Sequence, residues 1–251
     1  MSTLASYIDH TILKPTTSHI EITKICKEAL EYSFAAVCVP PPYVEAAKAA
    51  LAPSQFTAGG QLHGVKAATV IGFPFGYSNV RAKLDETELA LLDGAAELDV
   101  VINLTALKNG NWHYLGEEMR LIADMVHANG ALVKTIIESG ILSDEEIVRC
   151  CEVYAGAGVD FLKTSTGYAE KGASVHAVQL MRQHLPASIR IKASGGIRTY
   201  AFAKELIEAG ADRLGCSASV EIVKGDPSRV PNEGRASGTG RSSAAAGAEG
   251  Y

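Results

Sequence analysis

The sequence has few cysteines, and their number and spacing suit neither a disulfide scaffold nor a metal site. Five cysteines occur in 251 residues, Cys150 and Cys151 are adjacent, and no two form a C-x-x-C pair. The odd number favours free thiols and a reducing cytoplasm. The seven histidines are scattered and lack a ligand spacing such as H-E-x-x-H, so we expect no metal.

Other signals that would place the chain in a membrane or on a nucleic acid are also missing. No apolar run reaches the length of a membrane span. The N-terminus MSTLASYIDHTILKP lacks the basic and long apolar segments of a secretory signal. Basic residues are not in excess, since 23 Lys+Arg face 28 Asp+Glu for a net charge of -5, which argues against a nucleic-acid partner. With 47% hydrophobic residues, the composition is that of a globular protein.

Short β-branched runs recur along the chain, and helical patterns separate them. One such pattern begins with a capping box, Ser143 with Glu146, and glycines are expected to end helices at Gly130, Gly158 and Gly210. The eight runs are Ile8–Thr11, Phe34–Val39, Ala67–Phe73, Leu98–Asn103, Leu132–Glu138, Val159–Thr164, Ile189–Ser194 and Arg213–Ser217. Eight strands that alternate with helices predict an α/β fold, the (β/α)8 TIM barrel.

A doubly wound open sheet is the main alternative, but no G-x-G-x-x-G follows the first run. The composition changes at Gly225, where a segment dominated by Gly, Ser, Ala and Pro begins. Such a segment cannot bury a core. We therefore expect a single barrel domain over residues 1–224 and a mobile tail over 225–251, which ends on Tyr251.

Two lysines occupy matching places on consecutive predicted strands, Lys163 in FLKTSTG and Lys192 in IRIKASGG. Burial and a neighbouring ammonium group both disfavour a charged lysine, so one of them is expected to become a neutral nucleophile. The alternative is a lysine whose ammonium reaches water at the strand end. Asp99, in ELDVVIN, is either the counter-ion of a buried lysine or a proton relay, and the residues leave both readings open.

Glycine-rich turns follow three neighbouring strands and predict a site for a phosphorylated substrate. They are Thr164-Ser165-Thr166-Gly167, Ser194-Gly195-Gly196 and Gly215-Cys216-Ser217. Turns of this kind offer backbone N–H groups to an anion, and the loops after the last two strands are the usual phosphate site of a barrel. His10, beside Asp9, and Cys38 are interpreted as structural residues.

At these residues the sequence resembles the deoxyribose-phosphate aldolases, class I aldolases with a TIM-barrel fold. The pair KTSTG and KASGG, with Asp99 upstream, carries the resemblance most specifically. Further matching motifs extend from the N-terminus to about Val223; they read IDHTILKP, VCV, TVIGFP, ELDVVIN, VKTIIE, DFLKTSTG, IKASGGIRT and GADRLGCS.

The resemblance implies roles for individual residues. Lys163 matches the Schiff-base lysine, Lys192 the lysine that perturbs it, and Asp99 the proton relay. The residues that match substrate-binding positions are Asp9, Thr11, Lys134, Gly167, Gly195, Gly196 and Ser217. Many members of the family end on a tyrosine that assists proton exchange, so Tyr251 is a candidate proton shuttle. Two positions depart from the family pattern, since Ala218 replaces a second serine and Pro40 an asparagine.

The implied reaction is the reversible cleavage of 2-deoxy-D-ribose 5-phosphate to acetaldehyde and D-glyceraldehyde 3-phosphate, in the catabolism of deoxynucleosides. An iminium ion serves as the electron sink, so no cofactor is expected. The resemblance also implies a homodimer. Two alternatives remain, a lysine aldolase for another sugar phosphate and a catalytically silent sugar-phosphate sensor, and a retro-aldol assay separates them.

Overall fold

The computed structural model describes residues 3–52 and 64–227, which form a closed barrel of eight parallel strands in sequence order. Strand β1 pairs with both β2 and β8, which closes the barrel. The strands are β1 (Ile8–Thr11), β2 (Ala36–Val39), β3 (Lys66–Ile71), β4 (Glu97–Val101), β5 (Leu132–Ile136), β6 (Phe161–Lys163), β7 (Arg190–Ser194) and β8 (Arg213–Cys216). The predicted TIM barrel is confirmed, and each of the eight runs overlaps one strand, with β3 and β4 beginning one residue earlier than predicted.

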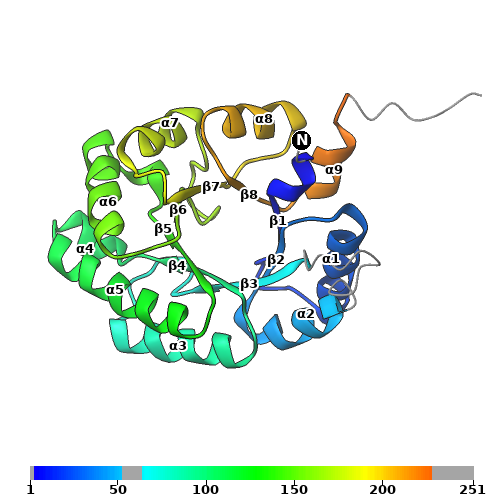
Figure 1. The fold of residues 1–251 in the computed structure, drawn as a ribbon, viewed down its shortest axis with the longest axis horizontal. Helices are drawn as coiled ribbons and strands as arrows, with labels where there is room; N and C mark the ends of the chain where they lie inside the picture. Colours follow the sequence, from blue (N-terminus) through cyan, green and yellow to red (C-terminus); the bar gives the residue numbers. More distant parts are fainter. Residues whose placement is uncertain (1–2, 53–63, 228–251) are drawn as a thin grey trace, which may run out of the picture.

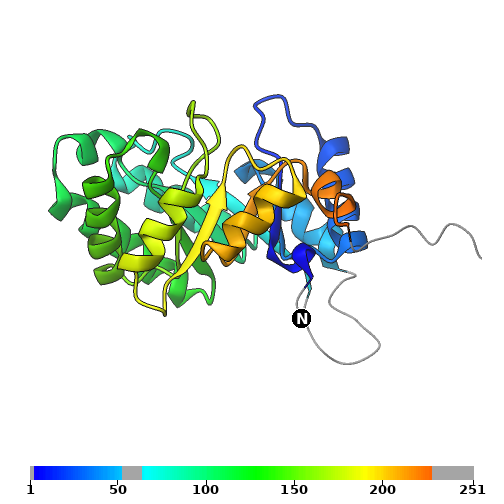
Figure 2. The ribbon, with the colours of Figure 1, turned by 90° about the horizontal axis from the view of Figure 1, so that it is seen from above.

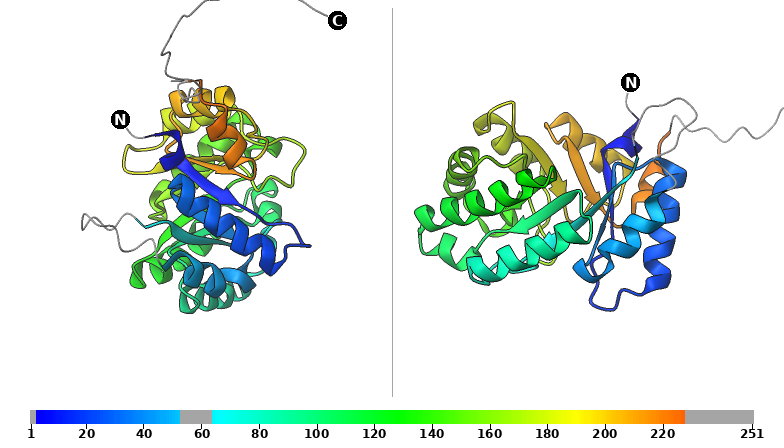
Figure 3. Two further views of the ribbon diagram at one scale, coloured as in Figure 1. Left: turned by 90° about the vertical axis from the view of Figure 1, so that its right-hand side faces the viewer. Right: turned by 60° about the horizontal axis from the view of Figure 1, so that its bottom comes forward.

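Helices form an outer layer around the strands (Figures 1 and 3). Their bounds are α1 (His19–Tyr32), α2 (Val44–Leu51), α3 (Val80–Leu92), α4 (Leu104–Lys108), α5 (Trp112–Ala128), α6 (Asp144–Gly156), α7 (Val175–His184), α8 (Tyr200–Glu208) and α9 (Ser219–Lys224). Short 3-10 helices occupy Leu4–Tyr7, Pro41–Tyr43 and Ser139–Ile141. In the part of the chain that the structure describes, no helix is both long and apolar enough to cross a membrane.

Polar side chains fix where most helices begin. The predicted capping box of Ser143 and Glu146 is present at α6, and Ser18 forms a second one with Glu21 at α1. The side chains of Asn79, Asn103, Asn111, Ser174 and Thr199 accept backbone N–H groups at α3, α4, α5, α7 and α8. The expected helix-ending glycines all have positive φ, 70° at Gly130, 78° at Gly158 and 114° at Gly210.

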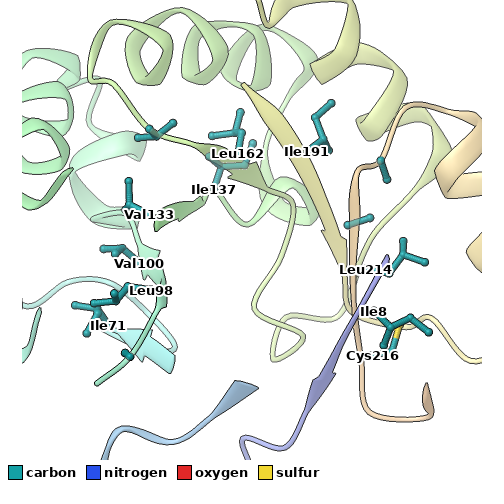
Figure 4. Close-up of a cluster of buried hydrophobic side chains, with 14 of the residues drawn as sticks. Ile8, Ile71, Leu98, Val100, Val133, Ile137, Leu162, Ile191, Leu214 and Cys216 are labelled. Carbon is teal, nitrogen blue, oxygen red and sulfur yellow. The ribbon is translucent and has the colours of Figure 1, made fainter. Parts of the chain in front are cut away.

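Alternate residues of the strands face opposite sides of the barrel wall. The outward side chains pack against the helices in one large apolar core, of which Figure 4 labels Ile8, Ile71, Leu98, Val100, Val133, Ile137, Leu162, Ile191, Leu214 and Cys216. The inward side chains of β2 and β3 form a separate small cluster, Ala36, Cys38, Ala68 and Val70. The remaining strands direct charged side chains into the lumen, described below.

The strands run upward in Figure 2, so their carboxyl ends and the loops that follow lie along its upper edge. Residues that end strands therefore meet at one mouth of the barrel. The predicted division between a barrel over 1–224 and a tail over 225–251 stays a prediction, because the tail beyond residue 227 lies outside the described residues. Tyr251 lies there as well.

Candidate active site

The two lysines singled out in the sequence lie side by side in the lumen. Lys163 ends β6 and is directly paired in register with Lys192 on β7. Asp99, on β4, accepts a hydrogen bond from each ammonium or amine nitrogen, at 2.6 Å from Lys163 and 2.7 Å from Lys192. Lys163 is 2% exposed, and Lys192 and Asp99 are fully buried. The structure thus brings together the three residues predicted to carry the chemistry.

The surroundings of the two lysines shift their pKa values in opposite directions. Burial lowers the pKa of Lys163, and the Lys192 ammonium lowers it further, while Asp99 opposes both effects. Burial also disfavours the charged form of Lys192, but the carboxylates of Asp9 and Asp99 outweigh it and raise the pKa of Lys192. Lys163 is therefore the lysine that loses its proton more readily, and Lys192 remains an ammonium group.

Asp99 is held as a carboxylate by three lysines. Its burial alone raises the pKa, but the ammonium groups of Lys134, Lys163 and Lys192 bring the pKa of Asp99 well below its ordinary value. Lys134, on β5, donates to the second oxygen of Asp99 at 2.8 Å and is paired with it in register. Asp99 therefore accepts hydrogen bonds from three lysines and is not the counter-ion of one lysine alone.

Asp9 and Lys134 lie within the wall of the lumen, away from open space. Asp9, on β1, accepts a 2.5 Å hydrogen bond from Lys192, and Lys134 forms a 2.7 Å ion pair with Glu97. Both side chains are fully buried. Each contacts a catalytic candidate, Asp9 through Lys192 and Lys134 through Asp99, so an effect of either residue on substrate passes through these two.

Two charged residues of the lumen, Glu97 and Arg213, were not anticipated from the sequence. Arg213, on β8, donates from Nε to Asp9 at 2.8 Å and pairs with Glu97 at 2.9 Å. Glu97 precedes Asp99 by two residues on β4, so the two carboxylates face the same side of the barrel wall. The period-two spacing of acidic residues in a buried strand was the signal that could have identified Glu97.

A cavity of about 520 Å³ opens at the carboxyl ends of the strands, and Lys163 lines it. Of the described residues expected to bind substrate, the following line it too: Thr11, Gly167, Gly195, Gly196 and Ser217. Asp9, Asp99, Lys134 and Lys192 do not, which leaves Lys163 as the catalytic candidate that a ligand reaches directly. Three cations that the sequence reasoning missed also line the cavity, Lys14, Lys24 and Arg198, together with the carboxylates of Glu21, Glu28 and Glu221.

The glycine-rich turns after β6 and β7 approach each other closely at this mouth. Gly195 has a φ of 88°, and a Cβ there would lie 3.0 Å from the Cα of Gly172 and 3.3 Å from that of Gly167. Glycine is thus required both by conformation and by space. The contact places the backbone of both turns at one side of the cavity.

Glu138, which follows β5, forms hydrogen bonds with the first of these turns. Its buried carboxyl group accepts hydrogen bonds from the hydroxyl of Thr166 and from the Thr166 N–H at 3.3 Å. Burial raises the pKa of Glu138. Its backbone has a φ of 55°, a left-handed conformation that is uncommon for a non-glycine residue and that the sequence did not reveal.

The other polar residues weighed in the sequence have structural surroundings. Both ring nitrogens of buried His10 have partners, Ser219 at 2.9 Å and Glu28 at 2.8 Å. Cys38 is fully buried, which raises the pKa of its thiol to about 11. Ala218 precedes α9 without a side-chain cap, and Pro40 precedes the 3-10 helix Pro41–Tyr43. No group of three or more His, Cys, Asp or Glu in residues 3–52 and 64–227 is arranged to hold a metal ion.

A buried lysine of lowered pKa at the end of a barrel strand, in contact with a carboxylate and beside a charged lysine, is the arrangement of a Schiff-base-forming aldolase. The chain belongs to the DeoC/LacD family of aldolases, whose family model matches residues 3–238. It is 46% identical to the deoxyribose-phosphate aldolase of Caldicellulosiruptor saccharolyticus over 224 residues, which cover 89% of this chain and 98% of that one.

Similar relatives and solved structures agree with this assignment. The deoxyribose-phosphate aldolase of Thermococcus kodakarensis is 46% identical over 89% of this chain and 97% of its own. The solved structure of the aldolase QR15 has a TM-score of 0.80 at 38% identity and covers 89% of this chain and 96% of that one. The deoxyribose phosphate aldolase of Aeropyrum pernix, described as tetrameric, has a TM-score of 0.79 at 32% identity, over 88% of this chain and 89% of its own.

Proposed function

We propose that this protein reversibly cleaves 2-deoxy-D-ribose 5-phosphate to acetaldehyde and D-glyceraldehyde 3-phosphate. The observation that carries the proposal is Lys163, a buried amine of lowered pKa that lines the cavity and contacts Asp99 at 2.6 Å. The relatives named deoxyribose-phosphate aldolase, at 46% identity over most of the chain, support the choice of substrate.

In the synthetic direction, the neutral amine of Lys163 attacks the carbonyl carbon of acetaldehyde, the hydroxyl group of the resulting carbinolamine takes up a proton, and water leaves to form an iminium ion. A proton is then lost from the methyl carbon, relayed by a water, Asp99 and Lys192, to give an enamine. The enamine carbon bonds to the aldehyde carbon of the phosphorylated acceptor, and water releases the product. The 2.6 and 2.7 Å contacts of Asp99 with Lys163 and Lys192 support this relay.

The substrate phosphate is assigned to the glycine-rich side of the cavity. Gly167, Gly195 and Gly196 offer backbone N–H groups there, and Ser217 adds a hydroxyl. Arg198, two residues after Gly196, lines the same cavity and is proposed to add a positive charge on this side, which favours a phosphate dianion. Ala218 offers one hydroxyl fewer than a second serine would, while the backbone donors remain.

The other expected substrate contacts receive different roles. Thr11 lines the cavity and is assigned to the sugar, its hydroxyl already donating to the Asp9 carbonyl at 2.8 Å. Asp9 and Lys134 are assigned an indirect role, because they contact Lys192 and Asp99 instead of the cavity. Substitution of either residue is expected to shift the pH profile of turnover and to leave the Michaelis constant little changed.

Tyr251 lies outside the described residues, and its role as a proton shuttle rests on the resemblance. A phenol near the imine moves a proton to or from the methyl carbon. Tyr251→Phe is expected to slow turnover and proton–deuterium exchange into acetaldehyde together, while trapping at Lys163 stays intact. Wild-type rates in both Tyr251→Phe and a variant lacking the last residue would disprove the role.

The assembly and location of the protein are further parts of the proposal. The resemblance favours a homodimer, whereas the Aeropyrum pernix relative is described as tetrameric. Light scattering of the purified full chain distinguishes the two states. All five cysteines are free and buried, which agrees with a reducing cytoplasm.

A retro-aldol assay and a covalent trap test the function. The full chain is incubated with 2-deoxy-D-ribose 5-phosphate, and acetaldehyde release is followed. In parallel, acetaldehyde and borohydride should leave a reduced ethyl group on the peptide that holds Lys163. Lys163→Leu is the matched control and should show neither release nor label. Cleavage without the label, or a label on another lysine, would refute the mechanism, and a label without cleavage would refute the substrate.

A further inference from the structure

Six charged side chains in the lumen form a closed ring in which positive and negative groups alternate. They come from β1, β4, β5, β7 and β8. In order around the ring they are Arg213, Glu97, Lys134, Asp99, Lys192 and Asp9, which returns to Arg213. Each carboxylate therefore lies between two cations, and each cation between two carboxylates.

Every link of the ring is an ion pair or hydrogen bond at close range. From Arg213 onward the nitrogen–oxygen distances are 2.9 Å to Glu97, 2.7 Å to Lys134, 2.8 Å to Asp99, 2.7 Å to Lys192, 2.5 Å to Asp9 and 2.8 Å back to Arg213. The Arg213 side chain is 12% exposed, and the other five are 4% exposed or less. The ring is thus a buried and electrically balanced unit.

Lys163 lies outside the ring and touches it at Asp99, at 2.6 Å. Among the described residues, Lys163 forms one ion pair, the one with Asp99. Asp99 also forms ion pairs with Lys134 and Lys192. A proton on Lys163 would add a positive charge to a buried unit whose carboxylates are all shared between two cations. In a low-dielectric interior such an uncompensated charge is disfavoured.

We propose that Arg213 and Glu97 are positioning residues that close this ring and thereby keep Lys163 a neutral amine. The proposal rests on the function proposed above and deepens it. Neither residue lines the cavity, and they act through their neighbours in the ring, Asp9 and Lys134. The loss of the proton from Lys163 then depends on Lys192 and also on the balance between the charges of Arg213 and Glu97, which lie away from the cavity.

The other ionisable groups near Lys163 are Cys38 on β2 and Glu138 after β5. Burial keeps the Cys38 thiol protonated at neutral pH, because its pKa is raised to about 11. The carboxyl group of Glu138 is bound by Thr166 and lies outside the ring. Both groups are unchanged in the variants below, so differences between those variants report on the ring.

The charge balance predicts shifts of opposite sign. Arg213→Met removes a positive charge, so the remaining ring is negative and favours a proton on Lys163. Glu97→Gln removes a negative charge and disfavours that proton further. The double variant is balanced again and should behave like the wild type. A loss of packing or rigidity alone would not produce opposite shifts that cancel.

The probe is 2,4-pentanedione, a diketone that reports on the amine without any sugar. The neutral nitrogen of Lys163 attacks one carbonyl carbon, water leaves, and a stable enaminone forms that absorbs in the near ultraviolet. Its rate is measured against pH, and mass spectrometry locates the adduct. For Arg213→Met we expect the half-maximal rate about one pH unit higher, or about tenfold slower reaction at a fixed pH below it.

For Glu97→Gln the midpoint should fall, and for the double variant it should return to the wild-type value. Lys83→Met and Glu118→Gln are the matched controls, because they alter a buried ion pair outside the ring and should leave the midpoint unchanged. If Arg213→Met does not fold, Glu97→Gln and the double variant carry the test. Unshifted midpoints, or shifts of one sign in both single variants, would overturn the proposal.

This design separates the inference from the proposed reaction. Shifted midpoints together with no cleavage of 2-deoxy-D-ribose 5-phosphate would refute the substrate and keep the ring. Cleavage by the wild type with unshifted midpoints in the folded variants would refute the role of Arg213 and Glu97 and keep the function. An adduct confined to lysines other than Lys163 would refute the ring as the cause of its reactivity.

Discussion

Two buried lysines of this barrel, Lys83 and Lys163, differ in their use although burial lowers the pKa of both. Lys83 lies on α3, outside the barrel wall, and donates to Glu118 at 2.9 Å and to the carbonyl oxygen of Val101 at 2.8 Å. Lys163 lies inside the wall, contacts Asp99 at 2.6 Å and lines the cavity.

The two lysines differ in how their positive charge is compensated and in whether a ligand in the cavity can reach them. Lys83 has a carboxylate partner in Glu118, together with a carbonyl oxygen, and it does not line the cavity. Lys163 shares its carboxylate with two other ammonium groups. A lowered pKa therefore does not define a nucleophile by itself. A nucleophilic lysine also needs a counter-ion that is shared with other cations, and it needs access to the cavity.

The largest expected effect comes from removing the accessible lysine. Lys163→Leu should reduce turnover by at least about a thousandfold, because the other lysines that line the cavity, Lys14 and Lys24, are exposed and do not lie buried beside Asp99. The fold should persist, since the substitution exchanges a buried amine for an apolar side chain. Turnover and thermal unfolding are measured on the same preparation. Residual turnover within tenfold of the wild type would exclude Lys163 as the nucleophile.

The opposite outcome is expected at the compensated lysine. Lys83→Met should lower the free energy of unfolding by about 3–5 kcal/mol, because it leaves the buried Glu118 carboxylate without its cationic partner and with a neutral donor, the Tyr114 hydroxyl. Turnover per folded molecule should stay within about twofold. Chemical denaturation measures the first quantity, and the Lys83→Met/Glu118→Leu double variant is the control, expected to recover much of the loss. A selective loss of turnover at unchanged stability would make Lys83 part of the active site.

The role of the neighbouring ammonium group is tested by Lys192→Leu. Because Lys192 lowers the pKa of Lys163, its removal raises that pKa and leaves the amine protonated at neutral pH. Turnover should fall about a hundredfold at pH 7 and recover as the pH rises toward the new pKa. A turnover that stays low and flat to about pH 10 would reject the electrostatic effect and leave direct proton transfer as the role of Lys192.

These lysines also show which parts of the site can be predicted from the sequence. Lys163 and Lys192 could be placed together in advance, because each interrupts an apolar strand and consecutive strands of a barrel are neighbours. The closure of the ring could not, because Arg213 on β8 and Glu97 on β4 come from strands that are not neighbours in the barrel and meet across its lumen. Lys83 stands in a charged helical stretch, RAKLDETE, which is typical of a solvent-facing helix, so its burial depended on the packing of α3 against α5.

The smallest expected effect is that of a chelator. In the proposed mechanism the iminium ion on Lys163 withdraws the electrons that a divalent metal would otherwise withdraw, and the charged ring tunes the amine through fixed side chains. Turnover in EDTA should therefore equal turnover without it, for the wild type and for Lys83→Met alike. The measurement is the initial rate after dialysis against the chelator, with zinc added back to a second sample. A rate that falls on chelation and returns with zinc would require a metal at the site, and the amine of Lys163 would then no longer account for the electron sink.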